Sequence, residues 1–414
     1  MGQPATGLKS LADLGLDMFD PQAIARPHQF YARLREEAPV VWSEQTQSWV
    51  LTRYEDVRRG LRDNILFSSE RPDQALLRGR SDIPLERVEP PGTKNMLAAD
   101  RPDHTRLRKL LAMDFTPKKI IRMQPRIEEI CREVLQGAAD EGDYDVVTGL
   151  AEPLPVKIIA ELLGIPSELH SQFKQWSDAS ITPVPPDATD ASIHARNDLI
   201  TEFRKYLQAQ IEERHANPTN DFIGRLVAAH DEDSKLSDAE VLGAVNLLLL
   251  AGNETTTNLI SNATLAMSRF PERQTELREH PEMMETAVEE FLRYDGSVQF
   301  TSRILTEPAE FQGHTIDAGQ SVLLVLASAN RDPNVFDHPD ELDFHRPKDK
   351  HLGFGDWIHI CIGQFLARIE TRAALSALIE EFGEFELATA EADVPYRPNF
   401  NLRGPSHLLI RRRA

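Results

Sequence analysis

The stretch HLGFGDWIHICIG, residues 351–363, contains the feature on which the fold depends, a cysteine at the start of a helical pattern. Residues 362–383, IGQFLARIETRAALSALIEEFG, carry apolar side chains at helical spacing, so we expect a helix directly after Cys361. Backbone N–H groups at the start of a helix stabilise negative charge, which favours a thiolate at this position. The other cysteine, Cys131, lies within the helical pattern IEEICREVL and is interpreted as a small buried hydrophobic residue.

Composition narrows the class of protein. The chain has 414 residues, of which 41% are hydrophobic, enough for a substantial buried core. Two cysteines cannot form a disulfide framework and the first residues show no export signal, so we expect a cytoplasmic protein. The net charge of −20 argues against nucleic-acid binding. The longest apolar runs, VLGAVNLLLL and SVLLVLASA, fall short of the ~20 residues that cross a bilayer, so no membrane contact is expected.

Helical periodicity dominates the chain, with clear patterns at residues 124–142, 198–216, 240–270 and 362–383. Two segments, residues 40–54 and 310–329, predict short antiparallel strands joined by turns. We therefore predict a mainly α protein with a small antiparallel β part (α+β), folded as a single domain over residues 1–414. The proline-rich residues 181–191 cannot continue either flanking helix and are interpreted as a lid.

The pattern at residues 240–270 predicts an unusually long helix. Ser237 and Glu240 form a capping box at its start and Pro271 lies beyond its end, which gives roughly 30 residues, or about 45 Å. A polar stretch, AGNETTTN (251–258), interrupts the apolar residues of this helix. A glycine in a helix interior and an unpaired carboxylate in an apolar stretch both lower the stability of the folded protein. The stretch is therefore either a hydrophilic seam facing solvent or a groove beside a reacting ligand.

Four motifs occur in order: AGNETT (251–256), EEFLR (289–293), FHRP (344–347) and the cysteine segment. Together they resemble the cytochrome P450 family, in its soluble bacterial form. Residues 26–42 and 99–117 are similar to the first helix and sheet and to the haem-edge helix of that family, so the resemblance covers nearly the whole chain. It implies the cytochrome P450 fold, with the long central helix over the haem.

The resemblance assigns haem b as cofactor, with Cys361 as the ligand of the iron. The loop of the family usually reads Phe-Gly-x-Gly-x-His-x-Cys-x-Gly, and this chain matches it at Phe354, His359 and Gly363 but places Trp357 where the second glycine belongs. Either the turn takes a different path or the indole projects from the surface. The family also implies four cationic side chains that would hold the haem propionates: His104, Arg108, Arg303 and His359. It places Ala251 on the distal side of the haem. The family also implies a structural triad of Glu290, Arg293 and Arg346.

The implied activity is that of a haem-thiolate monooxygenase, which inserts one oxygen atom from O2 into a lipophilic small molecule. Glu254 would relay protons, and Thr255 would hydrogen-bond the oxygen being activated and the Ala251 carbonyl. Electrons would come from a ferredoxin-type partner docked at the Cys361 face of a monomer. We expect the docking charges in segments around that face: Arg106, Lys109, Lys348, Lys350, Arg368 and Arg372. The substrate pocket would include Leu247, Leu250, Val298, Phe300 and Phe400.

Two alternatives remain open. One is a haem-thiolate enzyme that uses peroxide, against which the Glu254–Thr255 pair argues. The other is a helical small-molecule-binding protein without haem chemistry, in which Cys361 is structural. The absorption of the reduced carbon monoxide complex separates them, since only a haem-thiolate protein absorbs at the long-wavelength position.

Overall fold

A computed structural model describes residues 10–70, 83–140, 142–181, 184, 188–228, 236–348 and 350–413. The chain divides into two compact units. The first consists of residues 1–69, 122–153 and 255–414, and the second of residues 70–121 and 154–254. The single domain that we expect over residues 1–414 stays a prediction.

A five-stranded sheet of order β1-β2-β8-β5-β3 lies in the first unit. β1 and β2 form an antiparallel hairpin in which Trp42 faces Trp49, and residues 40–54 are predicted to form such antiparallel strands. β8 pairs with β2 in parallel and with β5 in antiparallel, so the sheet is mixed. The strands are β1 (Val40–Ser43), β2 (Ser48–Leu51), β3 (Phe67–Ser68), β5 (Thr301–Leu305) and β8 (Ser321–Leu324).

Two smaller sheets complete the β part of the first unit. One joins β4 (Tyr144–Asp145), β10 (Leu409–Arg412) and β9 (Phe385–Leu387) in this order. The other is the hairpin of β6 (Ala309–Phe311) and β7 (His314–Ile316).

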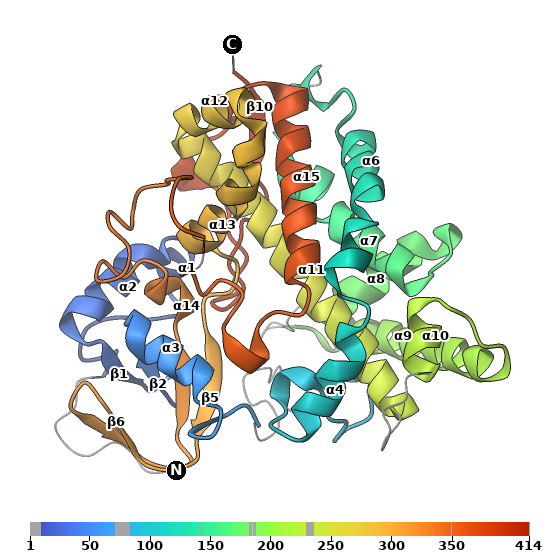
Figure 1. Cartoon of the computed structure of the whole chain (residues 1–414), viewed down its shortest axis with the longest axis horizontal. Helices are drawn as coiled ribbons and strands as arrows, with labels where there is room; N and C mark the ends of the chain where they lie inside the picture. Colours follow the sequence, from blue (N-terminus) through green and yellow to red (C-terminus); the bar gives the residue numbers. More distant parts are fainter. Residues whose placement is uncertain are drawn as a thin grey trace. The chain divides into compact units, whose positions relative to one another are not determined.

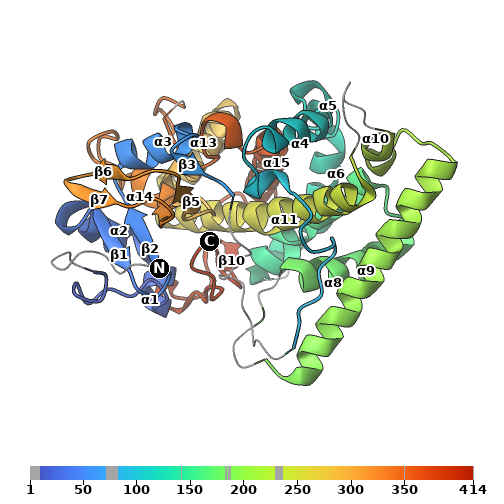
Figure 2. The ribbon, with the colours of Figure 1, turned by 90° about the horizontal axis from the view of Figure 1, so that it is seen from below.

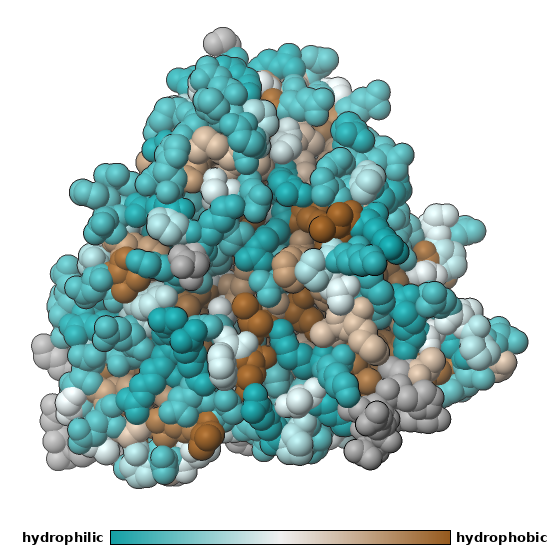
Figure 3. Space-filling model, in the orientation of Figure 1, coloured by the Kyte–Doolittle hydropathy of each residue, from teal (hydrophilic) through white to brown (hydrophobic). Residues whose placement is uncertain are grey.

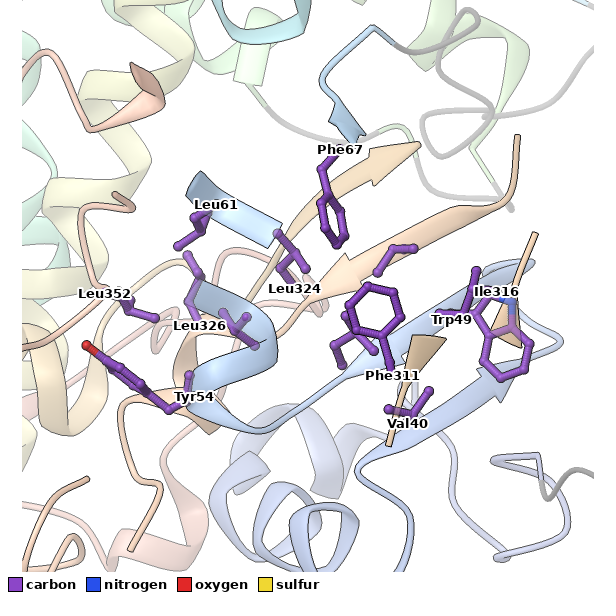
Figure 4. Close-up of a cluster of buried hydrophobic side chains, with 14 of the residues drawn as sticks. Val40, Trp49, Tyr54, Leu61, Phe67, Phe311, Ile316, Leu324, Leu326 and Leu352 are labelled. Carbon is purple, nitrogen blue, oxygen red and sulfur yellow. The ribbon is translucent and has the colours of Figure 1, made fainter. Parts of the chain in front are cut away.

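A hydrophobic core forms where α3 (Tyr54–Arg62) packs on the five-stranded sheet. Figure 4 shows the side chains of this core, among them Trp49, Phe67 and Phe311, each almost fully buried. Gly60 of α3 is required here, because a Cβ would lie 2.5 Å from the Leu324 side chain. The helix can therefore approach the sheet closely.

The helix predicted to follow the cysteine is α15 (Gln364–Phe382), and the described part of the first unit contains six further complete α-helices besides α3 and α15. Figure 1 shows α15 alongside α6 and α13, and α15 packs on both. Cys131 of α6 is fully buried, as predicted, and burial raises the pKa of its thiol to about 12. These helices are α1 (Pro21–Ala25), α2 (Pro27–Glu37), α6 (Gln124–Leu135), α12 (Pro271–Glu279), α13 (Met284–Asp295) and α14 (Leu326–Ala329).

The second unit is helical in the part that the structure describes. Its longest complete helix, α9 (Asp190–Ala216), packs against α8 (His170–Ile181) and α10 (Phe222–Ala228), as Figure 2 shows. Trp176 stacks on Phe203 with ring centroids 5.3 Å apart, which joins α8 to α9. The unit also contains α4 (Asp103–Ala112), α5 (Pro117–Ile121) and α7 (Pro153–Leu163), the last beginning at the boundary with the first unit.

The long helix α11 spans Asp238–Arg269, 32 residues, and ends two residues before Pro271 as predicted (Figure 2). The capping box is present: the Ser237 N–H donates to Glu240 at 2.9 Å and the Glu240 N–H donates to the Ser237 hydroxyl at 3.2 Å. No helix among the described residues is long and apolar enough to cross a membrane. The surface in Figure 3 is mostly hydrophilic, with small separate hydrophobic patches.

Candidate active site

The cysteine loop is shaped by backbone hydrogen bonds within residues 352–361. The Cys361 N–H donates to the Phe354 carbonyl at 2.8 Å, and the Gly355 N–H donates to the Leu352 carbonyl at 2.9 Å. Gly363 is the N-cap of α15, and a Cβ at Gly363 would lie 4.0 Å from the Cys361 sulfur. The sulfur therefore lies beside the start of a 19-residue helix, where the backbone favours negative charge.

Trp357 keeps the backbone conformation expected of the glycine that it replaces. Its φ is +60°, in the left-handed region, which in a bulky residue costs on the order of 1–3 kcal/mol. Its N–H donates to the Asp356 carboxylate at 2.7 Å, and its side chain is 55% exposed. The turn thus follows the expected path and the indole projects from the surface, which is the second of the two alternatives.

The polar stretch of α11 is largely buried. Asn253, Glu254 and Asn258 are each at most 6% exposed, so the interpretation as a seam facing solvent is wrong. Ala251 is exposed, and Leu247, Leu250 and Thr255 are partly exposed, on a helix whose intervening residues are mostly buried. Their spacing of three or four residues places these partly exposed side chains on one stripe of α11. Such a stripe is accessible to a ligand along the helix.

Close packing accounts for the glycine and asparagine of this stretch. A Cβ at Gly252 would lie 3.0 Å from the Ile159 side chain, so the glycine lets α7 approach α11. The Asn253 amide donates to the Ser177 hydroxyl of α8 at 2.9 Å, and both side chains are buried. The close approach of α7 accounts for the glycine, and the hydrogen bond to Ser177 satisfies the buried amide of Asn253.

The structure brings the predicted triad together. Arg293 donates to the Glu290 carboxylate through Nε and Nη2, each at 2.7 Å, and Arg346 donates to the same carboxylate at 3.1 Å. Arg293 and Glu290 are buried, and further donors of Arg293 reach the carbonyls of Asn330, Pro339 and Glu341. The triad therefore joins α13 to the segment 330–346 that leads into the cysteine loop.

The direct connection between α13 and the cysteine region is made by Glu289, which the sequence analysis did not identify. Its carboxylate accepts hydrogen bonds from Arg368 of α15 and pairs with His351 at 2.8 Å. These partners lower the pKa of Glu289 to about 2, although burial opposes the change. Arg368 also lies over the Phe354 ring at 4.5 Å. The sequence offered two signals for this contact: Glu289 is the first glutamate of the EEFLR motif, and Arg368 follows Cys361 by seven residues.

A second buried acid that the sequence analysis missed is Glu370 of α15. Its side chain is 2% exposed, the Thr256 hydroxyl of α11 donates to it, and its Oε1 atom has no partner. Burial raises the pKa of Glu370 to about 8. Thr256 adjoins Thr255, so this protonated carboxyl lies close to the residue predicted to act in catalysis.

The predicted propionate contacts lie in both units. In the first unit, Arg303 of β5 is 4% exposed and donates to the Thr301 hydroxyl and the Ser302 carbonyl, and His359 Nε2 lies 3.0 Å from the Ser69 hydroxyl. In the second unit, His104 and Arg108 lie one turn apart on α4. Their roles stay predictions.

Part of the predicted substrate pocket forms an aromatic cluster. Phe300 stacks on Phe400 with centroids 5.1 Å apart, and Phe19 lies 4.4 Å from Phe400. Val298 forms an isolated bridge with Leu402. Most of the lid predicted at Pro183–Pro186 and part of the predicted loop 69–100 lie outside the described residues.

Comparison with known proteins agrees with this arrangement. A model of the family described as Cytochrome P450 matches residues 155–406. The polyketide biosynthesis cytochrome P450 PksS of Bacillus subtilis is 36% identical over 396 residues, which cover 93% of this chain and 95% of that protein. The cytochrome P450 monooxygenase PikC of Streptomyces venezuelae is 36% identical over 416 residues, with 99% and 96% covered. The solved structure of PksS has a TM-score of 0.85 at 34% identity and covers 96% of this chain and 100% of that one.

The fold and the thiol at the start of α15 define a haem-thiolate oxidoreductase. The chain belongs to the cytochrome P450 family, and it is a monooxygenase. The predicted family, the predicted enzyme class and the mainly α fold with small sheets are thereby confirmed.

The residues present fit a haem group. Cys361 offers a single soft sulfur ligand, which would hold the iron of such a group. The buried guanidinium of Arg303 suits the carboxylates of such a group, because a buried cation is stabilised by a paired anion. When bound, the haem supplies the iron at which O2 is activated.

Proposed function

We propose that this enzyme binds haem b through Cys361 and hydroxylates, or similarly oxidises, a lipophilic small molecule with electrons from a ferredoxin. The single observation that carries the proposal is the position of Cys361. Its sulfur lies beside Gly363 at the start of α15, and its N–H is held by the Phe354 carbonyl. This geometry favours a thiolate at Cys361.

In this proposal, two residues of α11 deliver protons. Thr255 lies on the partly exposed stripe and would hold a hydrogen bond to the reacting oxygen and to the Ala251 carbonyl. Glu254, buried beside it, would pass protons to the Thr255 hydroxyl. O2 activation requires protons, and a chain with both residues can deliver them. The pair therefore favours a monooxygenase over a peroxide-dependent enzyme.

The proposed substrate is a lipophilic molecule of moderate size. The stripe on α11 offers Leu247 and Leu250, and the aromatic cluster offers Phe300 and Phe400. Similar proteins support this class: one relative is named vitamin D(3) 25-hydroxylase, and CYP109E1 of Bacillus megaterium has been solved with corticosterone and with testosterone. Cytoplasmic location and a monomeric state stay predictions.

The spectrum of the carbon monoxide complex tests whether Cys361 is the ligand of the haem iron. The reduced protein with carbon monoxide is expected to absorb at the long-wavelength position of thiolate ligation, and Cys361→Ser is expected to lose that band together with oxygenase activity. Cys131→Ala is the matched control, because it removes the other thiol from a buried position in α6. A Cys361→Ser variant that keeps the band and the activity would refute the assignment.

A further inference from the structure

In the second unit, the loop of residues 83–95 lies against the long helix α11. A Cβ at Gly243 of that helix would be 3.4 Å from the Thr93 side chain and 3.8 Å from the Glu89 Cβ. The glycine therefore lets the loop approach the helix closely. This contact holds the Glu89 side chain at the surface of the helix that carries the predicted substrate residues.

Glu89 and Asn246 form a polar pair at this contact. The Asn246 Nδ2 atom donates to the Glu89 carboxylate at 2.8 Å, and Glu89 is 8% exposed. The Arg87 guanidinium lies 3.8 Å from the other carboxylate oxygen and balances the charge of Glu89. Because a carboxylate only accepts hydrogen bonds, the Nδ2 atom must face it, and the Asn246 Oδ1 atom points away from it.

The pair has hydrogen-bonding capacity that the described residues leave unused. The Asn246 Oδ1 atom is buried and has no hydrogen-bond partner in the part of the chain that the structure describes. Within that same part, the Glu89 carboxylate accepts a hydrogen bond from Asn246 alone. A buried acceptor without a donor lowers the stability of a protein, so a donor from a bound molecule would be favourable here. Two neighbouring acceptors are therefore available to a ligand.

The backbone of the loop is fixed by α9, independently of this pair. The Asn197 side chain accepts a hydrogen bond from the Glu86 N–H and donates to the Pro84 carbonyl, both at 2.9 Å. Arg204 donates to further carbonyls of the same loop. These contacts hold the loop without the Glu89 carboxylate, so attachment of the loop does not by itself account for a buried carboxylate on α11.

Asn246 borders the partly exposed stripe of α11. Leu250 follows Asn246 by four residues, so the two side chains are neighbours on the helix surface. Because α11 is one continuous helix, the nine residues from Asn246 to Thr255 correspond to about 14 Å along its axis. The polar pair is therefore remote from the residue proposed to act at the reacting oxygen.

We infer that Glu89 and Asn246 anchor a hydroxyl group of the substrate, at the end of the molecule remote from the carbon that is oxidised. A hydroxyl supplies the donor that these acceptors lack. A neutral donor suits the site better than a cation, because Arg87 already balances the charge of Glu89. The inference rests on the proposed function, since it specifies the lipophilic substrate as one that carries a hydroxyl group.

The binding of dodecanol and of its methyl ether to the haem-loaded protein tests this anchor. The ether has the same apolar chain but cannot donate a hydrogen bond. A site built to hydrogen-bond a ligand group discriminates against an analogue that lacks the donor. In calorimetric titration, the wild type is therefore expected to bind dodecanol at least about tenfold more tightly than the ether.

Variants of the two acceptors assign the preference to the anchor. Glu89→Leu and Asn246→Leu are each expected to reduce the preference for the alcohol to about threefold or less, because each removes one acceptor. Glu89→Gln keeps the size and one acceptor oxygen and is expected to retain more of the preference than Glu89→Leu. Asn197→Ala is the matched control, since it loosens the same loop but removes neither acceptor, and its preference is expected to equal that of the wild type.

Three results overturn the inference. The first is a wild type that does not bind dodecanol or binds the alcohol and the ether equally. The second is a preference that is unchanged in both leucine variants, which would show that the pair only attaches the loop to α11. The third is oxidation of dodecanol mainly beside its hydroxyl group rather than towards its methyl end. The carbon monoxide spectrum is recorded for every variant: a wild type without the thiolate band refutes the proposed function, whereas a normal band without a preference refutes the anchor alone.

Discussion

Glu370→Gln tests the energetic state of the buried acid beside α11. Desolvation raises the pKa of Glu370 from 4.5 to about 8, and the hydrogen bond from the Thr256 hydroxyl opposes that change only in part. The folded protein therefore holds this carboxyl protonated at neutral pH. Glutamine has nearly the same shape and is neutral at every pH, so the substitution removes the titration with little change in packing.

The sign of the effect follows from proton linkage. Above pH 4.5 the unfolded chain loses the Glu370 proton while the folded chain keeps it until about pH 8, so the folded state binds more protons. The contribution of Glu370 to the free energy of unfolding then falls as pH rises through this window. Each pH unit is worth about 1.4 kcal/mol, so the full difference approaches about 5 kcal/mol at pH 8 and above.

The assay is urea unfolding of wild type and Glu370→Gln from pH 5 to pH 9. The two proteins are expected to be similar at pH 5, and the variant is expected to be more stable by several kcal/mol at pH 9. Glu380→Gln, which changes an exposed carboxyl on the same helix, is the matched control. A stability difference that does not change with pH would refute the protonated state of Glu370.

Three further predictions concern α13 and α11. Arg293→Ala leaves the buried Glu290 carboxylate without its main partner and is expected to destabilise the protein by about 3–5 kcal/mol in chemical unfolding; a loss below about 1 kcal/mol would contradict the buried ion pair. Ser237→Ala removes the cap of α11 and is expected to cost about 1 kcal/mol in the same assay, with no change in the carbon monoxide spectrum; an unchanged unfolding midpoint would show that the cap adds no stability. Thr255→Ala is expected to keep the haem spectrum while more reducing equivalents appear as peroxide than as product; unchanged coupling would remove Thr255 from the proton path.

Local sequence patterns predicted much of the fold. The capping box at Ser237 and Glu240 and the proline at position 271 predicted the limits of α11 closely, because both signals act within a few residues. The strand-like segment at residues 40–54 likewise predicted the antiparallel strands β1 and β2. The parallel pairing of β2 with β8 was not predicted, because it joins segments some 270 residues apart and depends on the whole sheet.

The candidate site also has features that the sequence predicted and features that only the tertiary structure showed. Motif order along the chain identified Cys361, the Glu290 triad and the family, and the helix after Cys361 follows from periodicity alone. The partners of Glu289, the pKa of Glu370 and the burial of Asn253 came only from tertiary packing, because each depends on side chains supplied by other helices.

Trp357 illustrates the limit most directly. The sequence by itself determined that a bulky residue replaces a glycine in the cysteine loop, and it left two conformations open. The folded structure decided between them, because Asp356 is held by Arg58 and Arg62 of α3 and in turn holds the Trp357 N–H. A backbone conformation that is unfavourable locally is stabilised here by contacts from a helix almost 300 residues earlier in the chain, and no local pattern encodes such contacts.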